Sequence, residues 1–310
     1  MSSFVVGIDV GGTNIKVGLI NPRGRVVARN NLSTKSLVRN KKQLIDVIVG
    51  ASHDIIKNNA LKPIDIMGFG LGLPGLVNTH KGIVLNLTNI PGCKNIPLAS
   101  IFKKYFKKPV AIDNDVNLMA LAEWQFGAGR GFKNVFCLTL GTGVGGGMIL
   151  DNQLYRGEGF SAGELGHVPL NENGPACNCG GRACLETYVG NQSLLVKVRR
   201  LFNNPTMALE AVARLAGQNN RQALRFWEET GAYIGLGLVS VVNLFNPERI
   251  VIGGGVANNW IYFLESMKAT IEERAMKIPG KMVKLVKAQL GEDAGMIGAK
   301  VLVTQSAGSR

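Results

Sequence analysis

The chain has 310 residues, of which 46% are hydrophobic and 18% are charged. This balance supports a folded core and excludes an intrinsically disordered protein. The net charge of +14 raises the question of nucleic-acid binding, but the basic residues of 103–108 and 281–287 recur every three to four positions. Such spacing favours solvated faces of helices or strands, so we expect no nucleic-acid partner, although a positive surface would also attract nucleotides. No apolar run reaches about 18 residues without a charge, and we therefore expect no membrane span.

We expect no export signal, because Met1, Ser2 and Ser3 lead directly into an apolar segment. We therefore expect a cytoplasmic protein in a reducing environment. In such an environment clustered cysteines favour a metal site over disulfides.

Hydrophobic periodicity predicts an alternation of strands and helices in the first part of the chain. The predicted elements are a strand, glycine turn and strand over 4–20, a third strand after 21–24, a helix over 41–58, a strand over 64–71, a strand over 109–112 and a helix over 118–126.

The later part of the chain repeats the opening pattern. The predicted elements are a strand, glycine turn and strand over 135–150, mostly helix over 191–245, a strand over 249–252 that ends in glycines, a helix over 256–275 and a helix over 294–303. The strand–turn–strand device thus occurs twice, about 130 residues apart, which predicts two similar halves with a cleft between them.

Two stretches match the dinucleotide pattern G-x-G-x-x-G, at 70–75 and at 141–146. Neither stands between a strand and a helix, so we reject both as dinucleotide fingerprints. The turns at 11–13 and 141–143 can still bind anions, because successive backbone N–H groups form a concavity to which Thr13 and Thr142 add hydroxyls. The alternative is that both are simple hairpin turns.

Five segments in a fixed order carry a resemblance to a known family. They are DVGGT at 9–13, LGLPGLV at 71–77, NDVN at 114–117, LGTGVGGG at 140–147 and AGELGH at 162–167, and GEDAGMIGA at 291–299 ends the match. From residue 5 to about 300 the chain resembles the ROK family of repressors, open-reading-frame proteins and sugar kinases.

This resemblance implies an α/β fold of two ribonuclease-H-like lobes of the actin and hexokinase type, flanking a cleft. We expect a smaller lobe at 1–117 and 296–310, and a larger lobe at 118–295 with a zinc site and the adenosine-binding segment. The family also implies a homodimer or homotetramer.

By the same resemblance the chain phosphorylates a sugar with ATP and Mg²⁺, with Asp115 as the catalytic base. A helix N-terminus would keep this carboxylate ionised, while Asp113 or Asn114 caps the helix. The sugar contacts carried over from the family are Gly75, Asn114, Asp115, Glu164, His167 and Glu186. The expected residues for the phosphates and Mg²⁺ are Asp9, Gly11, Gly12, Thr13, Gly141, Thr142 and Gly143, and those for adenosine are Gly253, Gly254 and Gly255.

Three of the five cysteines lie within eight residues, in the stretch CNCGGRACLE at 177–186. The zinc-binding members of the family have a Cys3His set, which here corresponds to Cys177, Cys179, Cys184 and His167 and suits structural zinc. His53 and His80 are expected at the surface, and Cys93 and Cys137 as ordinary buried thiols. Ala183 departs from the family's usual glycine and would carry about 1 kcal/mol of strain if that position needs positive φ.

Glucose, giving glucose 6-phosphate, is the first expectation for the sugar. N-acetylmannosamine or N-acetylglucosamine is the alternative, and fructose, mannose and allose follow. A sugar-responsive regulator of the same family is the competing class. Its repressors carry a winged helix-turn-helix module ahead of the kinase-like body, and we expect none here because the first predicted strand begins by residue 4.

Overall fold

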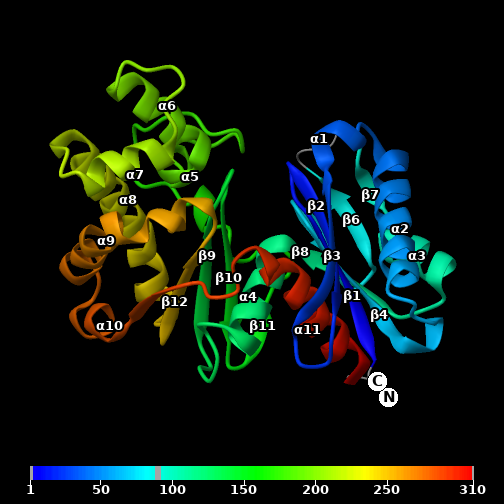
Figure 1. Cartoon of the computed structure of the whole chain (residues 1–310). Helices are drawn as coiled ribbons and strands as arrows, with labels where there is room; N and C mark the ends of the chain where they lie inside the picture. Colours follow the sequence, from blue (N-terminus) through cyan, green and yellow to red (C-terminus); the bar gives the residue numbers. More distant parts are fainter. Residues whose placement is uncertain (1–2, 88–91, 309–310) are drawn as a thin grey trace. The chain divides into compact units, whose positions relative to one another are not determined.

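A computed structural model describes residues 3–87 and 92–308 (Figure 1). The chain divides into two compact units. Unit 1 is formed by Met1–Gly131, Leu154–Ala162 and Leu290–Arg310, and unit 2 by Phe132–Gln153 and Gly163–Gln289. Each unit is built on a five-stranded sheet with helices packed against it, in agreement with the predicted α/β class.

The sheet of unit 1 has the strand order β3-β2-β1-β4-β8. β1 is antiparallel to β2 and parallel to β4, and β4 is parallel to β8. The strands are Phe4–Val10 (β1), Asn14–Ile20 (β2), Val26–Ser33 (β3), Ile66–Leu73 (β4) and Val110–Asn114 (β8). A small antiparallel sheet adds Leu76–Asn78 (β5), Ile83–Asn86 (β6) and Lys94–Ile96 (β7).

Helices cover both faces of the unit 1 sheet, with α2 and α11 on opposite sides (Figure 1). They are Thr34–Leu37 (α1), Lys41–Asn58 (α2), Leu98–Phe106 (α3), Asp115–Phe126 (α4) and Ala294–Gly308 (α11), with 3-10 turns at Pro63–Asp65 and Gly291–Asp293. On the α2 side a core of aliphatic side chains is completed by the stacked rings of Phe69 and Phe106. On the α11 side, side chains are absent at Gly7 and Gly70, where a Cβ would collide with the α11 backbone.

The main sheet of unit 2 has the strand order β11-β10-β9-β12-β13, although only Gln153 of β11 belongs to unit 2. The strands are Val135–Leu140 (β9), Val144–Leu150 (β10), Gln153–Tyr155 (β11), Arg249–Gly253 (β12) and Lys284–Lys287 (β13). The helices are Glu186–Val189 (α5), Asn191–Leu201 (α6), Leu209–Gly217 (α7), Arg221–Phe245 (α8), Trp260–Arg274 (α9) and Lys277–Met282 (α10), with 3-10 turns at Leu165–His167 and Gly255–Asn259. The long helix α8 packs closely on α9, because Gly231 and Gly235 leave room for the α9 backbone.

The two main sheets share one connectivity. β9 is antiparallel to β10 and parallel to β12, and β12 is parallel to β13, which is the same pattern as β1 with β2, β4 and β8. The strand–glycine turn–strand device therefore opens an equivalent sheet in each unit, as the repeat in the sequence predicts. The stretch at 141–146 lies in the antiparallel β9–β10 hairpin, and the stretch at 70–75 runs from the end of β4 toward β5. Neither therefore stands between a strand and a helix, which confirms that neither is a dinucleotide fingerprint.

The bounds of the two units differ from those expected from the sequence. The expected boundary fell at 117/118, but α4 lies wholly in unit 1. It packs against α11, where Gly298 leaves room for the backbone of Leu118. The segment Leu154–Ala162 also returns to unit 1, a crossing that hydrophobic periodicity does not reveal.

The basic runs lie on solvated faces, as predicted. Lys103 and Lys104 of α3 are exposed, and so are Lys284 and Lys287 of β13. Within 3–87 and 92–308, no helix combines the length and the apolar character needed to cross a bilayer.

Candidate functional site

Three parallel strands of unit 1 end at one edge of the sheet, and two of them, β1 and β8, carry an acidic residue there. Asp9 of β1 is in register with Gly72 of β4, which is in register with Asp113 of β8. Neighbouring strands lie about 4.8 Å apart, so Asp9 and Asp113 are two strand spacings from each other. Ligands of α/β sheets bind beyond the carboxyl ends of the strands, which makes this edge the candidate site of unit 1.

The start of α4 presents Asn114 and Asp115 at this edge. Asn114 is the N-cap, and its Oδ1 accepts from the backbone N–H groups of Val116 (2.8 Å) and Asn117 (3.3 Å). Its Nδ2 donates to the carbonyl of Gly75 at 3.1 Å, and the second hydrogen of that amide can still serve a ligand. The half-buried Asp115 is the first helical residue, at the positive end of the helix dipole. The structure thus brings together Gly75, Asn114 and Asp115.

Asp113 has a partner that the sequence analysis missed. Its Oδ2 accepts from Nε (2.8 Å) and a terminal nitrogen (2.7 Å) of Arg156, and its Oδ1 accepts from Nδ2 of Asn117 at 2.9 Å. The Asp113 side chain is only 2% exposed. This two-pronged pair fixes the end of β8 immediately before Asn114 and Asp115. No local pattern marks it, because Arg156 lies 43 positions further along the chain.

Loss of the Asp113–Arg156 pair is expected to destabilise unit 1. Asp113→Ala leaves the guanidinium and the Asn117 amide without their acceptors, and breaking a buried pair in this way costs about 3–5 kcal/mol. Urea denaturation should show this loss. Glu272→Ala, which removes the exposed Lys268–Glu272 pair, is the matched control and should change stability by less than about 1 kcal/mol. Equal effects of the two substitutions would contradict the assigned role of the buried pair.

The β1–β2 turn stands beside Asp9. The N–H of Gly11 donates to the Asn14 carbonyl at 2.8 Å, and Gly12 and Thr13 are exposed. Burial raises the pKa of Asp9 to about 6, while the Lys16 ammonium opposes this rise. The start of α11 closes over the carboxyl group, since a Cβ at Gly295 would lie 2.5 Å from the Asp9 Cγ.

The raised pKa of Asp9 gives a testable pH dependence of stability. The folded state holds the Asp9 proton up to about pH 6, whereas the unfolded chain releases it near the ordinary value of 3.8. Stability therefore falls as pH rises between these values, by at most about 3 kcal/mol. Asp9→Asn removes this term, so the variant should gain stability relative to wild type as pH rises from 4 to 7. Parallel stability–pH curves for the two proteins would contradict the assignment.

Unit 2 has the equivalent turn and a second group of glycines next to it. In the β9–β10 turn the N–H of Gly141 donates to the Gly143 carbonyl at 2.9 Å, and Thr142 is exposed. Gly253, the last residue of β12, is in register with Thr139 of β9. Gly254 has φ of +87°, and a Cβ there would collide with the Leu140 backbone, whereas Gly255 faces open space. The predicted phosphate and adenosine residues of unit 2 thus lie at neighbouring strand ends.

Unit 2 also carries the two acidic side chains Glu164 and Glu186, and His167 lies in the same loop as Glu164. The Oε2 atom of Glu186, the first residue of α5, accepts from the Val144 N–H of the β9–β10 hairpin at 2.8 Å. Although part of its side chain is exposed, desolvation raises the pKa of Glu164; the His167 ring opposes this rise, and the Glu186 carboxylate adds to it. The structure therefore groups Glu164, His167 and Glu186 within unit 2.

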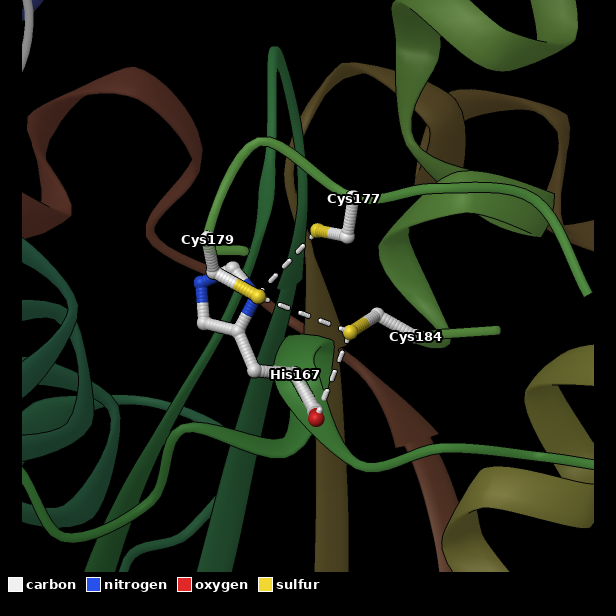
Figure 2. A group of neighbouring side chains, drawn as sticks. All are labelled: His167, Cys177, Cys179 and Cys184. Carbon is white, nitrogen blue, oxygen red and sulfur yellow. Dashed lines mark hydrogen bonds between the residues drawn. The ribbon is translucent and has the colours of Figure 1, made fainter. Parts of the chain in front are cut away.

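Four side chains of unit 2 form a compact cluster that could hold a metal ion. The donor atoms of His167, Cys177, Cys179 and Cys184 all lie within 4.8 Å of one another and face a common centre (Figure 2). The Sγ atoms of Cys179 and Cys184 are 3.7 Å apart, as are Cys177 Sγ and His167 Nδ1. A tetrahedral zinc ion with bonds of about 2.3 Å to sulfur requires ligand separations of about 3.6–3.8 Å, so the cluster fits zinc.

The other histidines and cysteines lie outside this cluster. His53 and His80 are exposed, and Cys93 and Cys137 are buried, as predicted. Ala183 is fully buried with φ of +56°. Position 183 therefore does need a positive φ, and the left-handed backbone of Ala183 carries about 1 kcal/mol of strain relative to glycine.

Comparison with known proteins bears on what these sites do. The model of the ROK family matches residues 5–306. The chain belongs to the ROK family. A glucokinase of Halalkalibacterium halodurans is 33% identical, with 99% of this chain and 96% of that protein covered. The xylose repressor of Bacillus subtilis is 30% identical over 97% of this chain and 77% of its own length. The relatives of this chain thus include both a glucokinase and a repressor.

A solved ROK structure supports the fold as well. The ROK glucokinase of Streptomyces griseus, in complex with glucose and AMPPNP, superposes with a TM-score of 0.84 at 28% identity, covering 98% of this chain and 100% of that one. This likeness confirms the predicted fold of the actin and hexokinase type.

Proposed function

We propose that this ROK protein is an ATP-dependent hexose kinase whose acceptor is glucose. The observation that carries the proposal is the position of Asp115. Its carboxylate stands at the first turn of α4, at the strand edge that also bears Asp9, and Asn114 takes over the capping of the helix. The N-cap is therefore Asn114, and we assign the chemistry to Asp115.

Phosphoryl transfer to a sugar needs a proton acceptor, neutralisation of the phosphates and in-line alignment. In the proposed reaction Asp115 accepts the proton of the attacking hydroxyl, and the helix N-terminus keeps the carboxylate ionised. Asn114 orients the sugar through its remaining amide hydrogen while Gly75 holds the other one. The Asp113–Arg156 pair fixes the backbone immediately before Asn114 and Asp115.

We assign nucleotide phosphates to the glycine turn of each hairpin. The exposed residues Gly12, Thr13 and Thr142 supply N–H groups and hydroxyls for phosphate oxygens. Bound Mg²⁺ would neutralise charge on the phosphates, and the Asp9 carboxylate is suited to orient it. We assign adenosine to the glycines at 253–255, where the absence of side chains lets a ligand approach the backbone.

The remaining sugar hydroxyls are assigned to Glu164, His167 and Glu186. If zinc is bound through His167 Nδ1, the proton of the ring resides on Nε2, which becomes a hydrogen-bond donor. The zinc ion would act structurally, because four protein ligands leave no open position for substrate. This arrangement gives the sugar two carboxylate acceptors and one imidazole donor.

Release of ADP in the presence of Mg·ATP tests the proposal. The panel comprises glucose, N-acetylmannosamine, N-acetylglucosamine, fructose, mannose and allose, and glucose is expected to give the highest kcat/KM. A higher value for an N-acetylhexosamine would replace the substrate but keep the kinase. Sugar binding without ADP release from any sugar would favour a regulator, in line with the repressor relative, and would overturn the kinase proposal.

A further inference from the structure

Glu186 makes a contact that sugar binding alone does not require. Its Oε2 accepts from the Val144 N–H, at the point where the β9–β10 turn enters β10. The same oxygen also lies close to Gly143, because a Cβ on Gly143 would be 2.5 Å from it. The absence of a side chain at Gly143 is therefore what allows the carboxylate to reach the turn.

The same segment also holds the other end of the turn. The N–H of Asn191, the first residue of α6, donates to the Gly141 carbonyl at 3.0 Å. The carbonyl of Glu186 is itself fixed by the Gly190 N–H at 2.9 Å and the Ser193 hydroxyl at 3.3 Å. Residues 186–191 thus grip the glycine turn on both sides, with the Glu186 side chain on one side and the α6 backbone on the other.

A carboxylate has two oxygens and about four acceptor positions. In Glu186 the Val144 N–H engages Oε2, and Oε1 is the oxygen left for a second donor. A ligand hydroxyl bound by Oε1 would fix the side chain in the rotamer that holds the turn. In the absence of that ligand, the turn depends on a half-buried side chain with more freedom to move.

We propose that Glu186 couples the sugar site to the nucleotide-phosphate turn, so that each ligand strengthens the binding of the other. This inference rests on the proposed function, since it assigns the sugar to Oε1 and the phosphates to the 141–143 turn. Coupling between two sites is reciprocal, and typical values amount to about 5- to 150-fold in affinity. The contacts that join Glu186 to the turn all lie within unit 2. The coupling therefore does not depend on Asp115.

The test measures the Kd of Mg·AMPPNP by calorimetry with and without saturating glucose. Wild type should bind the analogue at least about fivefold more tightly with glucose present. Gly143→Ala adds a methyl group that displaces the Glu186 carboxylate yet leaves its charge intact, and Glu186→Ala removes the carboxylate. Both variants should bring the ratio of the two Kd values close to one.

Gly141→Ala is the matched control, because its Cβ would meet only the Gly143 carbonyl at 3.9 Å. Whatever it does to nucleotide affinity, it should keep the wild-type ratio. A wild-type ratio of one, or a wild-type ratio in Gly143→Ala, would overturn the coupling role even if the enzyme turns over glucose. Absence of ADP release with every sugar would instead overturn the proposed function. Zinc content and circular dichroism establish that each variant is folded.

Discussion

An Asp115→Asn variant is expected to lose about 10²- to 10⁴-fold in kcat, the range that a general base contributes. The amide has nearly the same shape as the carboxylate but cannot take up the proton of the attacking hydroxyl. Because Oδ1 of Asp115 also accepts from the Val116 N–H at 2.9 Å, asparagine retains an acceptor for the start of α4. The variant should therefore fold normally and fail in the chemical step.

Separate measurements of binding and turnover check this expectation. The Kd for glucose should stay within a few-fold of wild type, while single-turnover ADP formation slows by the full factor. Asp54→Asn, on the exposed side of α2, is the matched control and should keep the wild-type rate. Undiminished turnover in Asp115→Asn would remove Asp115 from the role of base.

The features predicted best from sequence are those carried by local patterns. The helix over 41–58 is found at the residues expected, because apolar side chains recur at helical spacing and Asn40 caps its start. Both glycine hairpins were predicted, since a turn needs only its own few residues. The exposed basic faces follow from the same periodicity.

The features missed are contacts between segments distant in sequence. The buried Glu123 illustrates this, because its two carboxylate oxygens accept from the N–H groups of Ala128 and Leu290, both at 2.8 Å. By helical spacing alone it is one more residue of α4. The contact of Glu186 with Val144 was missed for the same reason, because 42 positions separate the two residues.

Removal of the zinc is the second large effect that we expect. Purified protein should contain about one zinc ion per chain, and Cys179→Ala should lose it, because three ligands no longer complete the tetrahedron. Cys93→Ala, which removes a buried thiol outside the cluster, is the control and should retain the metal. Metal-free protein at full activity would refute the Cys3His assignment.

The kinetic consequence of zinc loss should appear in KM for the sugar more than in kcat. The cluster ties His167 to Cys184, and these residues adjoin the two segments that carry Glu164 and Glu186. Asp115 lies in unit 1, whereas the cluster lies in unit 2. A rise in KM of about 10- to 100-fold, the range seen when support around a metal site is lost, with a smaller fall in kcat, would fit a structural clamp.

Backbone hydrogen bonds, rather than zinc, could hold these two segments together, and the experiment distinguishes the two explanations. The N–H of Leu185 donates to the Val168 carbonyl at 3.0 Å, and the N–H of Leu170 donates to the Ala183 carbonyl at 2.9 Å. If these bonds suffice, zinc loss would lower the melting temperature but leave KM unchanged. The strained φ of Ala183 lies within this ladder, so Ala183→Gly should relieve about 1 kcal/mol. If Ala183→Gly restores KM in the zinc-free protein, the backbone ladder rather than the metal sets the sugar-binding geometry.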